Sequence, residues 1–315
     1  MTRLAELTTT GIGGEAASFA EPATRDELVA VAREAFAAQT DEAPVLIVGG
    51  GSNLLVSDGP VPGAVIRVAT RGVEFGEPDA SGRTLVVAEA GEPWAALVGA
   101  CVDRGLAGIE ALAGIPGTAG AAPVQNIGAY GQELASVLTR IALALRDVSA
   151  DGIGEPVQYG QLASALGVEL GERVPLREAR VAVVALRRSK GMVLDPSDPD
   201  TRSTGSFFTN PVVSQEFARA MPEDMPRYPA PEAEDGTKLV KLSAAWLIDH
   251  AGVKKGFALP GSKAAVSSKH TLAITNRGGA TAEEIAELAR FIGARVRSEY
   301  GVDLRPEPVV IGLDI

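Results

Sequence analysis

The chain has 315 residues, an apolar fraction of 46% and a net charge of −11 at pH 7. Its length predicts about two domains, and its acidic balance excludes non-specific nucleic-acid binding through a basic surface. A single cysteine, Cys101, excludes an internal disulfide, while the lack of a signal-peptide pattern or of ~18 consecutive apolar residues predicts a cytoplasmic protein that does not insert into membranes.

Helical and strand patterns alternate along the chain. The strands are short and apolar, and they cover residues 45–48, 64–69 and 84–91. The helices have the α-helical period and cover residues 24–38, 92–106, 177–191, 243–252 and 281–301. Two helices begin with capping-box spacing, at Thr24/Glu27 and Thr281/Glu284. The mixture predicts an α+β fold with several lobes.

Three finer expectations follow from the same patterns. Within residues 177–191, Val181, Val184 and Ala185 are predicted to share one helix face. Cys101 lies in the apolar helix of residues 92–106 and is predicted to pack as a small hydrophobic residue. Two Pro- and Asp-rich spans separate the later elements and are predicted to be exposed loops; they cover residues 195–205 and 221–236.

The first glycine-rich segment, "VGGGSNLL", follows the strand at residues 45–48. Successive N–H groups in such a run can point at one anion, as in a phosphate-binding nest, and Ser52 and Asn53 add side-chain donors. The spacing matches neither the G-x-G-x-x-G nor the P-loop pattern. An ordinary connection from strand to turn is therefore the alternative interpretation.

The second segment, "GIPGTAGAAPVQNIGAYG" from Gly114 to Gly131, lies in a stretch without any charged residue over 111–132. Its glycines let the backbone approach a flat ligand, and its neutrality suits a dehydrated contact. Gln125, Asn126 and Tyr130 offer hydrogen bonds to the edge of a heteroaromatic ring. The two segments together suggest a dinucleotide with a buried ring system, and the residues alone leave open whether this is a flavin.

The chain resembles the UDP-N-acetylenolpyruvoylglucosamine reductase (MurB) family of peptidoglycan biosynthesis. The matching stretches occur in family order and span nearly the whole chain: "LTTTGIGG", "VGGGSNLLVSD", "GIPGTAGAAPVQNIGAYGQE", "YGQL", "RRSKGMVLD", "GSFFTNP", "HTLAITNRGGATAEEI" and "RPEPVVIG". The resemblance implies the FAD-binding fold of vanillyl-alcohol oxidase type plus a smaller α/β substrate-binding domain. It implies a first FAD lobe at residues 1–60 to which 290–315 return, a second lobe at 61–190 and the substrate domain at 191–289.

The resemblance also implies roles for individual residues. Both glycine segments would bind FAD, through Gly49, Gly50, Gly51, Ser52, Asn53, Gly114, Ile115, Gly117, Gly120, Ala121, Asn126, Gly128, Ala129 and Tyr130. Ser206 would donate the proton, and Glu307 would act as an acid that polarises the substrate carboxylate or stabilises the intermediate. Locally, a turn serine and a solvated loop glutamate are the alternatives. The UDP-sugar would be bound by Tyr159, Arg187, Lys190 and Asn210.

The cofactor and partners follow from the same comparison. No His or Cys lies beside the glycine segments, so FAD is expected to be non-covalent, with NADPH as reductant and a UDP-sugar as substrate. His250 lies on a predicted helix and is expected to be a packed or surface ring, and His270 has no evident role. We expect a monomer without a metal site.

The chain departs from the family pattern near Ile141. The family carries a Tyr-Arg-x-Ser segment with a catalytic arginine after "GAYGQE", whereas this chain has no Tyr-Arg dipeptide. A few dozen residues are missing, and Arg140 and Arg146 flank the junction as weak candidates to replace the lost cation. Three readings remain: an active NADPH-dependent reductase of peptidoglycan precursors, a FAD-binding member with little activity, and an oxidase of the same fold. The Ser206 and Glu307 segments favour the reductase.

Overall fold

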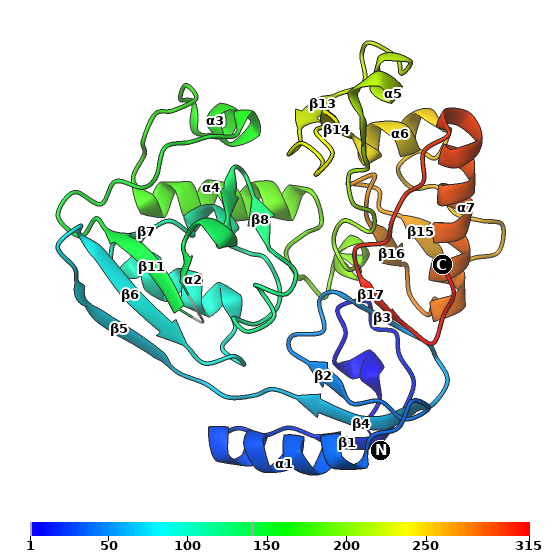
Figure 1. The fold of residues 1–315 in the computed structure, drawn as a ribbon, viewed down its shortest axis with the longest axis horizontal. Helices are drawn as coiled ribbons and strands as arrows, with labels where there is room; N and C mark the ends of the chain where they lie inside the picture. Colours follow the sequence, from blue (N-terminus) through cyan, green and yellow to red (C-terminus); the bar gives the residue numbers. More distant parts are fainter. Residues whose placement is uncertain (1, 140–141) are drawn as a thin grey trace. The chain divides into compact units, whose positions relative to one another are not determined.

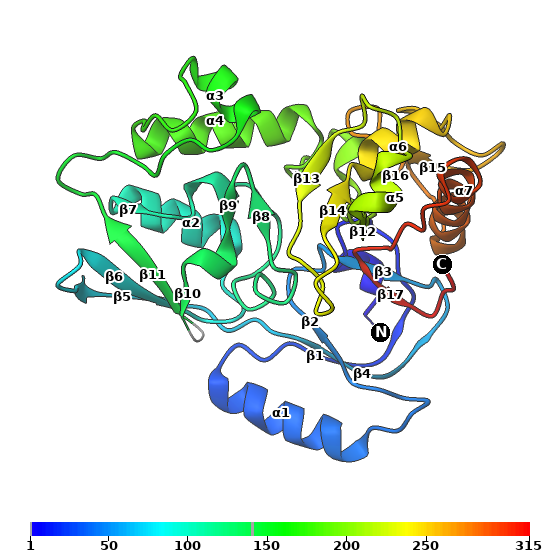
Figure 2. The same cartoon turned by 45° about the horizontal axis from the view of Figure 1, so that its top comes forward.

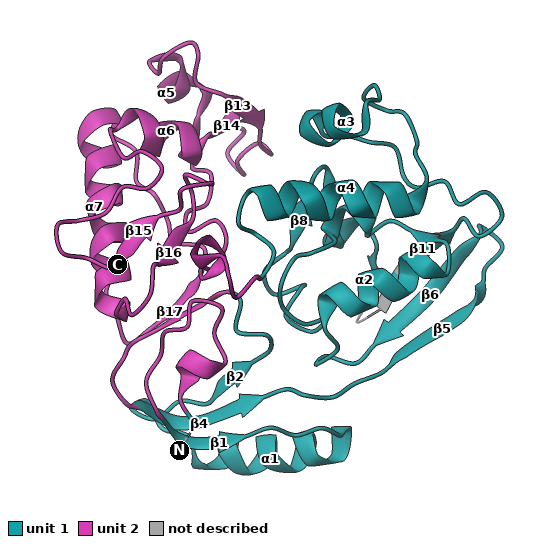
Figure 3. Cartoon of the chain, turned by 180° about the vertical axis from the view of Figure 1, so that it is seen from behind, with its two compact units in different colours: residues 1–2, 16–52, 61–194 teal, residues 3–15, 53–60, 195–315 magenta. Residues whose placement is uncertain are grey.

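The computed structural model describes residues 2–139 and 142–315, and the fold is drawn in two views in Figures 1 and 2. The chain forms two compact units, which Figure 3 shows in different colours. Unit 1 contains residues 2, 16–52 and 61–194, and unit 2 contains residues 3–15, 53–60 and 195–315. Each unit mixes helices with sheets, which confirms the predicted α+β class.

Unit 1 contains two sheets and a short hairpin. The first sheet is parallel, with the strand order β1 (Ala16–Ala20), β4 (Val61–Arg67) and β2 (Leu46–Val48). The second is antiparallel, with the order β10 (Leu138–Thr139), β11 (Ala142–Asp147), β6 (Arg83–Ala88) and β5 (Val73–Pro78), and β7 (Leu106–Ala107) also pairs with β11. The hairpin consists of β8 (Gly128–Ala129) and β9 (Gln132–Glu133).

The helices of unit 1 follow the predicted periodicity. They are α1 (Arg25–Ala38), α2 (Trp94–Asp103), α3 (Gly160–Leu166) and α4 (Leu176–Ser189), with short 3₁₀ turns at Glu110–Leu112 and Leu134–Ser136. The Thr24/Glu27 capping box forms at the start of α1. The core gathers around α2, where Trp94 and Leu97 pack with Leu112 and Leu145. Cys101 is buried in this core, and its burial raises the pKa of the thiol to about 12.

The prediction that Val181, Val184 and Ala185 form the apolar face of α4 is wrong. Leu176, Ala179 and Val183 are the buried residues, whereas the Val181 side chain is 66% exposed. The run from Val181 to Ala185 is apolar on all sides, so its own pattern selects no face. Leu176 and Ala179 add the i, i+3, i+7 spacing that turns Val183 inward.

Unit 2 is built from short sheets and one long helix. Its sheets are the antiparallel order β12 (Val212–Ser214), β14 (Leu239–Leu242) and β13 (Arg227–Pro229), the hairpin of β15 (Ala264–Val266) and β16 (Ile274–Asn276), and the parallel pair of β3 (Leu54–Val56) and β17 (Val309–Ile311). The helical elements are α5 (Gln215–Arg219), α6 (Ala244–His250), α7 (Ala282–Tyr300) and 3₁₀ turns at Leu4–Glu6 and Pro199–Thr201. The Thr281/Glu284 capping box starts α7, which packs against α6 and the β15–β16 hairpin.

One predicted loop is not exposed. In residues 195–205, the side chains of Asp200, Thr201 and Ser203 are buried, whereas residues 221–236 are mostly exposed as predicted. The composition of residues 195–205 is that of a surface loop, but the segment contacts the β15–β16 hairpin through hydrogen bonds that composition does not reveal.

Two features of the whole chain complete the description. The chain crosses between the two units several times, the last time at residues 194–195, and the finer three-part division into FAD lobes and a substrate domain remains a prediction. Within the described residues, no helix combines the length and apolar character needed to cross a membrane.

Candidate functional site

The two glycine segments, far apart in the sequence, meet within unit 1 through residues 49–52 and 116–118. A Cβ on Gly50 would lie 2.6 Å from the Gly117 Cα, and a Cβ on Gly49 would lie 2.5 Å from the Thr118 Oγ1. The Ser52 hydroxyl donates a hydrogen bond to the Pro116 carbonyl at 3.1 Å. The backbones therefore touch at positions where no side chain fits.

The remaining cofactor candidates of unit 1 lie along the same loops. Gly51, Gly114 and Gly117 adopt left-handed backbone angles, with φ of 62°, 75° and 126°. A Cβ on Gly120 would lie 2.7 Å from the Ala90 Cβ, and one on Gly49 would meet Ala121 at 3.2 Å. Gly128 and Ala129 form β8, and Ile115 packs at the edge of the unit 1 core.

Two non-glycine residues of the neutral loop have left-handed backbones. Asn126 has φ of 44° and Tyr130 has φ of 49°. Asparagine tolerates this region, but tyrosine adopts it rarely and at a cost of about 1–3 kcal/mol. Such strain is concentrated at ligand-binding positions, which supports a binding role for this end of the loop.

These loops fit a bound dinucleotide such as FAD. Their backbones pack so closely that any Cβ at the contact would collide with the other loop, and the Thr118 Oγ1 beside this contact is buried without a hydrogen-bond partner in the described part of the chain. A buried hydroxyl without a partner costs free energy, and a ligand oxygen at this point would satisfy it. Neutral glycine backbone is the environment that close contact with a flat ring requires.

Four of the predicted residues form a cluster within unit 1. The rings of Tyr130 and Tyr159 meet edge to face with 5.5 Å between their centroids. The Lys190 Nζ lies 5.4 Å from the Tyr130 centroid and donates a hydrogen bond to the Gln161 Oε1 at 2.6 Å. Arg187 and Lys190 lie at the end of α4, and Tyr159 precedes α3. The cluster thus offers two cations and two aromatic rings.

Arg187 has an unusual environment for a cation. Its Nη2 donates to the Met192 carbonyl at 3.3 Å, but its Nε is buried and has no partner among the residues described. Burial lowers the pKa of the guanidinium, although the neighbouring Tyr130 hydroxyl opposes this shift. An arginine remains charged in proteins, so Arg187 presents a desolvated positive charge that an anionic ligand would stabilise.

The segment that follows Ser206 is paired with the segment that carries Glu307 in unit 2. The Glu307 N–H donates to the Phe207 carbonyl at 2.9 Å, and the Thr209 N–H donates to the Arg305 carbonyl at 3.0 Å. Phe208 and Pro306 form an antiparallel bridge between these two hydrogen bonds. The residue next to Ser206 is therefore bonded directly to Glu307, 100 positions further along the chain.

The Glu307 carboxyl is partly desolvated. Burial raises its pKa above the ordinary value of 4.5. Its backbone is anchored on the other side by Asn53, whose Nδ2 donates to the Glu307 carbonyl at 3.3 Å. Asn53 was predicted to bind the cofactor; the structure places it in unit 2, with its side chain engaged by the Glu307 backbone.

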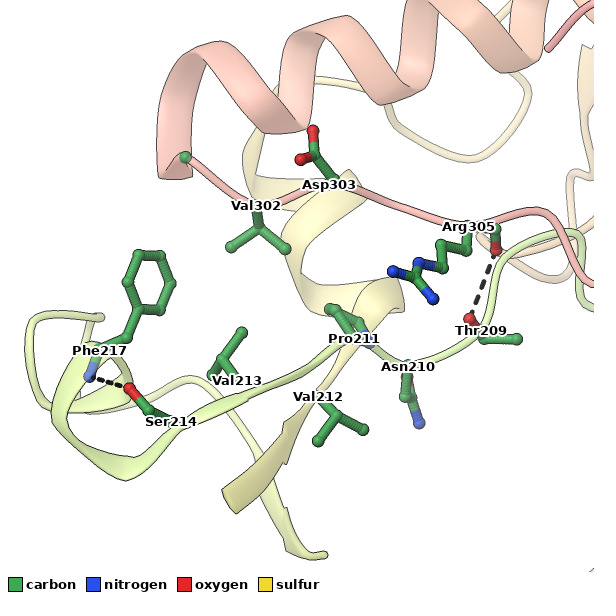
Figure 4. A pocket seen from close by; sticks show the side chains of 11 residues that line it. Thr209, Asn210, Pro211, Val212, Val213, Ser214, Phe217, Val302, Asp303 and Arg305 are labelled. Carbon is green, nitrogen blue, oxygen red and sulfur yellow. Dashed lines mark hydrogen bonds between the residues drawn. The ribbon is translucent and has the colours of Figure 1, made fainter. Parts of the chain in front are cut away.

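Asn210 lines a pocket of about 570 Å³ in unit 2. Figure 4 shows Arg305 extending from the segment after α7 toward Pro211, with Val212, Val213 and Phe217 further along the pocket. Arg305 has no ion-pair partner among the described residues, whereas Asp303 lies 3.4 Å from the Arg297 Nε. The Asn210 Oδ1 accepts the Ala244 N–H at 2.9 Å, so this side chain also fixes the start of α6.

Of the two junction arginines, Arg146 lies within the described residues and is engaged by its own turn. The Arg146 Nε donates to the Glu155 Oε1 at 2.8 Å, and its Nη2 donates to the Ile153 and Gly154 carbonyls at 3.1 Å. Arg146 therefore braces a turn of unit 1, in line with its weak candidacy as a replacement for the lost cation. Arg140 and Ile141 lie outside the described residues, and β10 and β11 pair on the two sides of them.

Sequence reasoning missed several polar residues. Thr118 lies within the quoted neutral loop and Gln161 within "YGQL", so both stood in motifs without being singled out. Arg305 stands two residues before Glu307, where only the tertiary pairing reveals its place in the pocket. Asp200 lay in a span predicted to be exposed, and no local signal marks its burial.

Comparisons with known proteins agree over the whole chain. Residues 16–153 match the FAD binding domain family, and residues 196–311 match the family described as UDP-N-acetylenolpyruvoylglucosamine reductase, C-terminal domain. Proteins named UDP-N-acetylenolpyruvoylglucosamine reductase are 46% identical in Leifsonia xyli, covering 99% of this chain and 98% of that protein, and 42% identical in Thermobifida fusca, covering 99% and 97%.

A solved structure supports the same assignment. The crystal structure of UDP-N-acetylenolpyruvylglucosamine reductase from Thermus caldophilus has a TM-score of 0.57 and 26% identity, covering 98% of this chain and 97% of its own. The Leifsonia alignment runs over 376 positions against the 315 residues of this chain, so that relative carries residues without a counterpart here, in agreement with the shortened junction. The chain belongs to the UDP-N-acetylenolpyruvoylglucosamine reductase family.

Proposed function

We propose that this chain is a FAD-dependent reductase that converts UDP-N-acetylglucosamine enolpyruvate to UDP-N-acetylmuramate in peptidoglycan precursor synthesis. NADPH is the reductant, FAD is held non-covalently, and the protein works in the cytoplasm as a monomer. Full-length similarity to named reductases supports this assignment. The structural observation that carries it is the backbone pairing of residues 207–209, directly after Ser206, with residues 305–307.

The cofactor would be held by the glycine cradle of unit 1. The candidates are the predicted residues of both loops together with the Thr118 hydroxyl. When bound, FAD accepts a hydride from NADPH and supplies it to the substrate double bond. The chain's contribution here is a closely packed neutral surface, which excludes water and places no fixed charge against the ring system.

Ser206 completes the reduction by moving one proton. The hydride forms a C–H bond at one alkene carbon, and the displaced electron pair spreads over the neighbouring carbon and the carboxylate. The Ser206 hydroxyl protonates that neighbouring carbon, so the pair becomes the second C–H bond, and the serine recovers a proton from solvent. A serine is a weak acid, so groups that stabilise the developing negative charge must assist it. Glu307, held on the paired segment and partly desolvated, is the candidate for this assistance.

The substrate's diphosphate is assigned to the cationic residues. Arg187 and Lys190 supply the positive charge, and Tyr159 supplies a ring and a hydroxyl beside them. Charge-assisted hydrogen bonds to phosphate are about twice as strong as neutral ones, which a net-acidic protein needs in order to hold a dianion. Asn210 is proposed as a further substrate contact.

The proposal is tested with Ser206→Ala and rapid-mixing absorbance of the two half-reactions. We expect flavin reduction by NADPH at the parent rate, and reoxidation by the enolpyruvyl sugar slowed by about 10²–10⁴-fold, the usual contribution of a general acid. Ser262→Ala is the control, because it removes another hydroxyl of unit 2, which hydrogen-bonds to Ala264 and to the Glu284 side chain. Equal slowing of both half-reactions, or none, would remove Ser206 from the role of proton donor.

A further inference from the structure

Asp200 is a buried carboxylate that the proposed chemistry does not use. It lies in the 3₁₀ turn Pro199–Thr201, six residues before Ser206, and is only 4% exposed. A buried carboxylate is costly unless it is hydrogen-bonded or paired. The Ser268 N–H donates to its Oδ1 at 2.9 Å, the Ser268 hydroxyl donates to its Oδ2 at 2.5 Å, and the Arg277 Nη2 lies 3.7 Å away.

The balance of these contacts keeps the carboxylate ionised. Burial alone would raise the pKa of Asp200, but the hydrogen bonds from Ser268 and Ser267 and the charge of Arg277 outweigh it and lower the pKa below the ordinary 3.8. The group is therefore a charged acceptor held in one geometry, and not a neutral acid.

The loop that binds Asp200 also binds the chain on the other side of Ser206. Ser268 lies in the turn between β15 and β16, and Leu272 lies in the same turn. The Phe207 N–H donates to the Leu272 carbonyl at 2.7 Å. Ser206 thus stands between two attachment points on a single turn, with Asp200 upstream and Phe207 directly downstream.

Further hydrogen bonds hold the residues between Asp200 and Ser206. The Asn276 N–H in β16 donates to the Arg202 carbonyl at 3.0 Å, and the Ser203 hydroxyl accepts the Gly205 N–H at 3.2 Å. Gly205 itself has φ of 78°, so the turn into Ser206 is sharp. A sharp turn clamped at both ends leaves little freedom at the residue it carries.

We propose that Asp200 is a positioning residue for Ser206: through Ser268 it clamps the upstream end of the turn that presents the serine hydroxyl. This inference rests on the proposed role of Ser206. Asp200 is not proposed to contact substrate or cofactor. It affects the reaction only by fixing the position of the serine. Misplacing a reacting group by about 1 Å can cost 10²-fold in rate.

Asp200→Asn tests the proposal in the FAD-loaded full-length chain. The amide keeps the size of the carboxylate but turns one acceptor into a donor facing Ser268 and Arg277. We expect reoxidation of the flavin by the enolpyruvyl sugar to slow by about 10- to 100-fold, while reduction by NADPH and the dissociation constant of the sugar stay within about twofold. A purely structural role would instead lower FAD content or slow both half-reactions together, and that result would overturn the proposal.

Substitutions at Ser268 provide an independent test if the Asp200→Asn variant fails to fold. Ser268→Ala removes the hydroxyl and keeps the N–H, so it should slow reoxidation in the same direction, whereas Ser268→Thr keeps the hydroxyl and should restore the parent rate. Contacting residues are non-additive, so the double variant should be no slower than Asp200→Asn alone. Additive effects, or normal reoxidation in Ser268→Ala, would contradict the clamp.

Two controls separate this inference from the proposed function. Asp249→Asn removes the ion pair with Lys254 at 2.6 Å elsewhere in unit 2 and should leave both half-reactions unchanged. If Ser206→Ala does not slow reoxidation, the proposed proton donor fails and the clamp fails with it. If Ser206→Ala slows reoxidation while Asp200→Asn and Ser268→Ala do not, only the clamp is overturned.

Discussion

At the scale of single residues, Glu307 combines a desolvated carboxyl with a backbone bonded on both sides. Its N–H is bonded to Phe207 and its carbonyl to Asn53, so the position of the residue does not depend on its charge. The side chain can then be varied without losing the pairing of the two segments. This separation makes Glu307→Gln informative about charge alone.

Glu307→Gln should slow reoxidation of the flavin and change the dependence of stability on pH. Because the folded-state pKa is raised, the carboxyl's stabilising contribution is present below the ordinary value of 4.5 and is lost as the pH rises through the folded value. The glutamine cannot ionise, so the variant does not lose stability in this way. Its melting temperature should therefore rise relative to the parent's from acidic to neutral pH. Thermal melts across that range measure this change, and a variant melting temperature that falls relative to the parent's toward neutral pH would show that the carboxyl is favourably ionised in the folded chain.

At the scale of elements, the contact between the two glycine loops fixes the distance between them at the proposed cofactor site. Gly50 meets the backbone of Gly117, and backbone cannot move aside as a flexible side chain can. Ala at position 50 therefore forces the loops apart.

Gly50→Ala should reduce the flavin bound per mole of purified protein by at least about tenfold, because its Cβ would lie 2.6 Å from the Gly117 Cα. Gly99→Ala is the matched control in unit 1, since its Cβ would meet only the end of the Arg180 side chain at 3.4 Å. Flavin absorbance per protein after gel filtration measures both. Full flavin occupancy in Gly50→Ala would place the cofactor away from this cradle.

At the scale of the whole molecule, FAD is expected to be a reversible ligand whose binding adds to the stability of the folded chain. Ligand binding to the folded state at 100 times its dissociation constant contributes about 2.7 kcal/mol. The only cysteine is buried, with a thiol pKa of about 12, and offers no reactive thiolate for covalent attachment.

The FAD-free chain should therefore melt at a lower temperature than the FAD-loaded chain, with a difference that grows with added FAD. Acid precipitation of the yellow protein should leave the flavin in the supernatant. Scanning calorimetry with increasing FAD and absorbance of the two fractions provide the measurements. Colour retained in the pellet would indicate a covalent link, and a melting temperature indifferent to FAD would argue against binding to the folded state.

The sequence alone determined the features that depend on neighbouring residues. The helix periods and the Thr24 and Thr281 capping boxes depend only on residues a few positions apart in the sequence. They form as predicted. The family stretches identified the fold class, the FAD domain and the reductase relationship. Their residue-level roles remain proposals, although the structure groups Tyr130, Tyr159, Arg187 and Lys190 as one cluster.

The tertiary structure decided everything that depends on distant segments meeting. It buries Val183 and leaves Val181 exposed on α4. It also brings Gly50 into contact with Gly117 and forms the hydrogen bond between Phe207 and Glu307. It also buried Asp200 in a span whose composition is typical of an exposed loop. Contacts of this kind depend on loop closure and on the packing of whole elements, so no local pattern of residue types specifies which partners will meet.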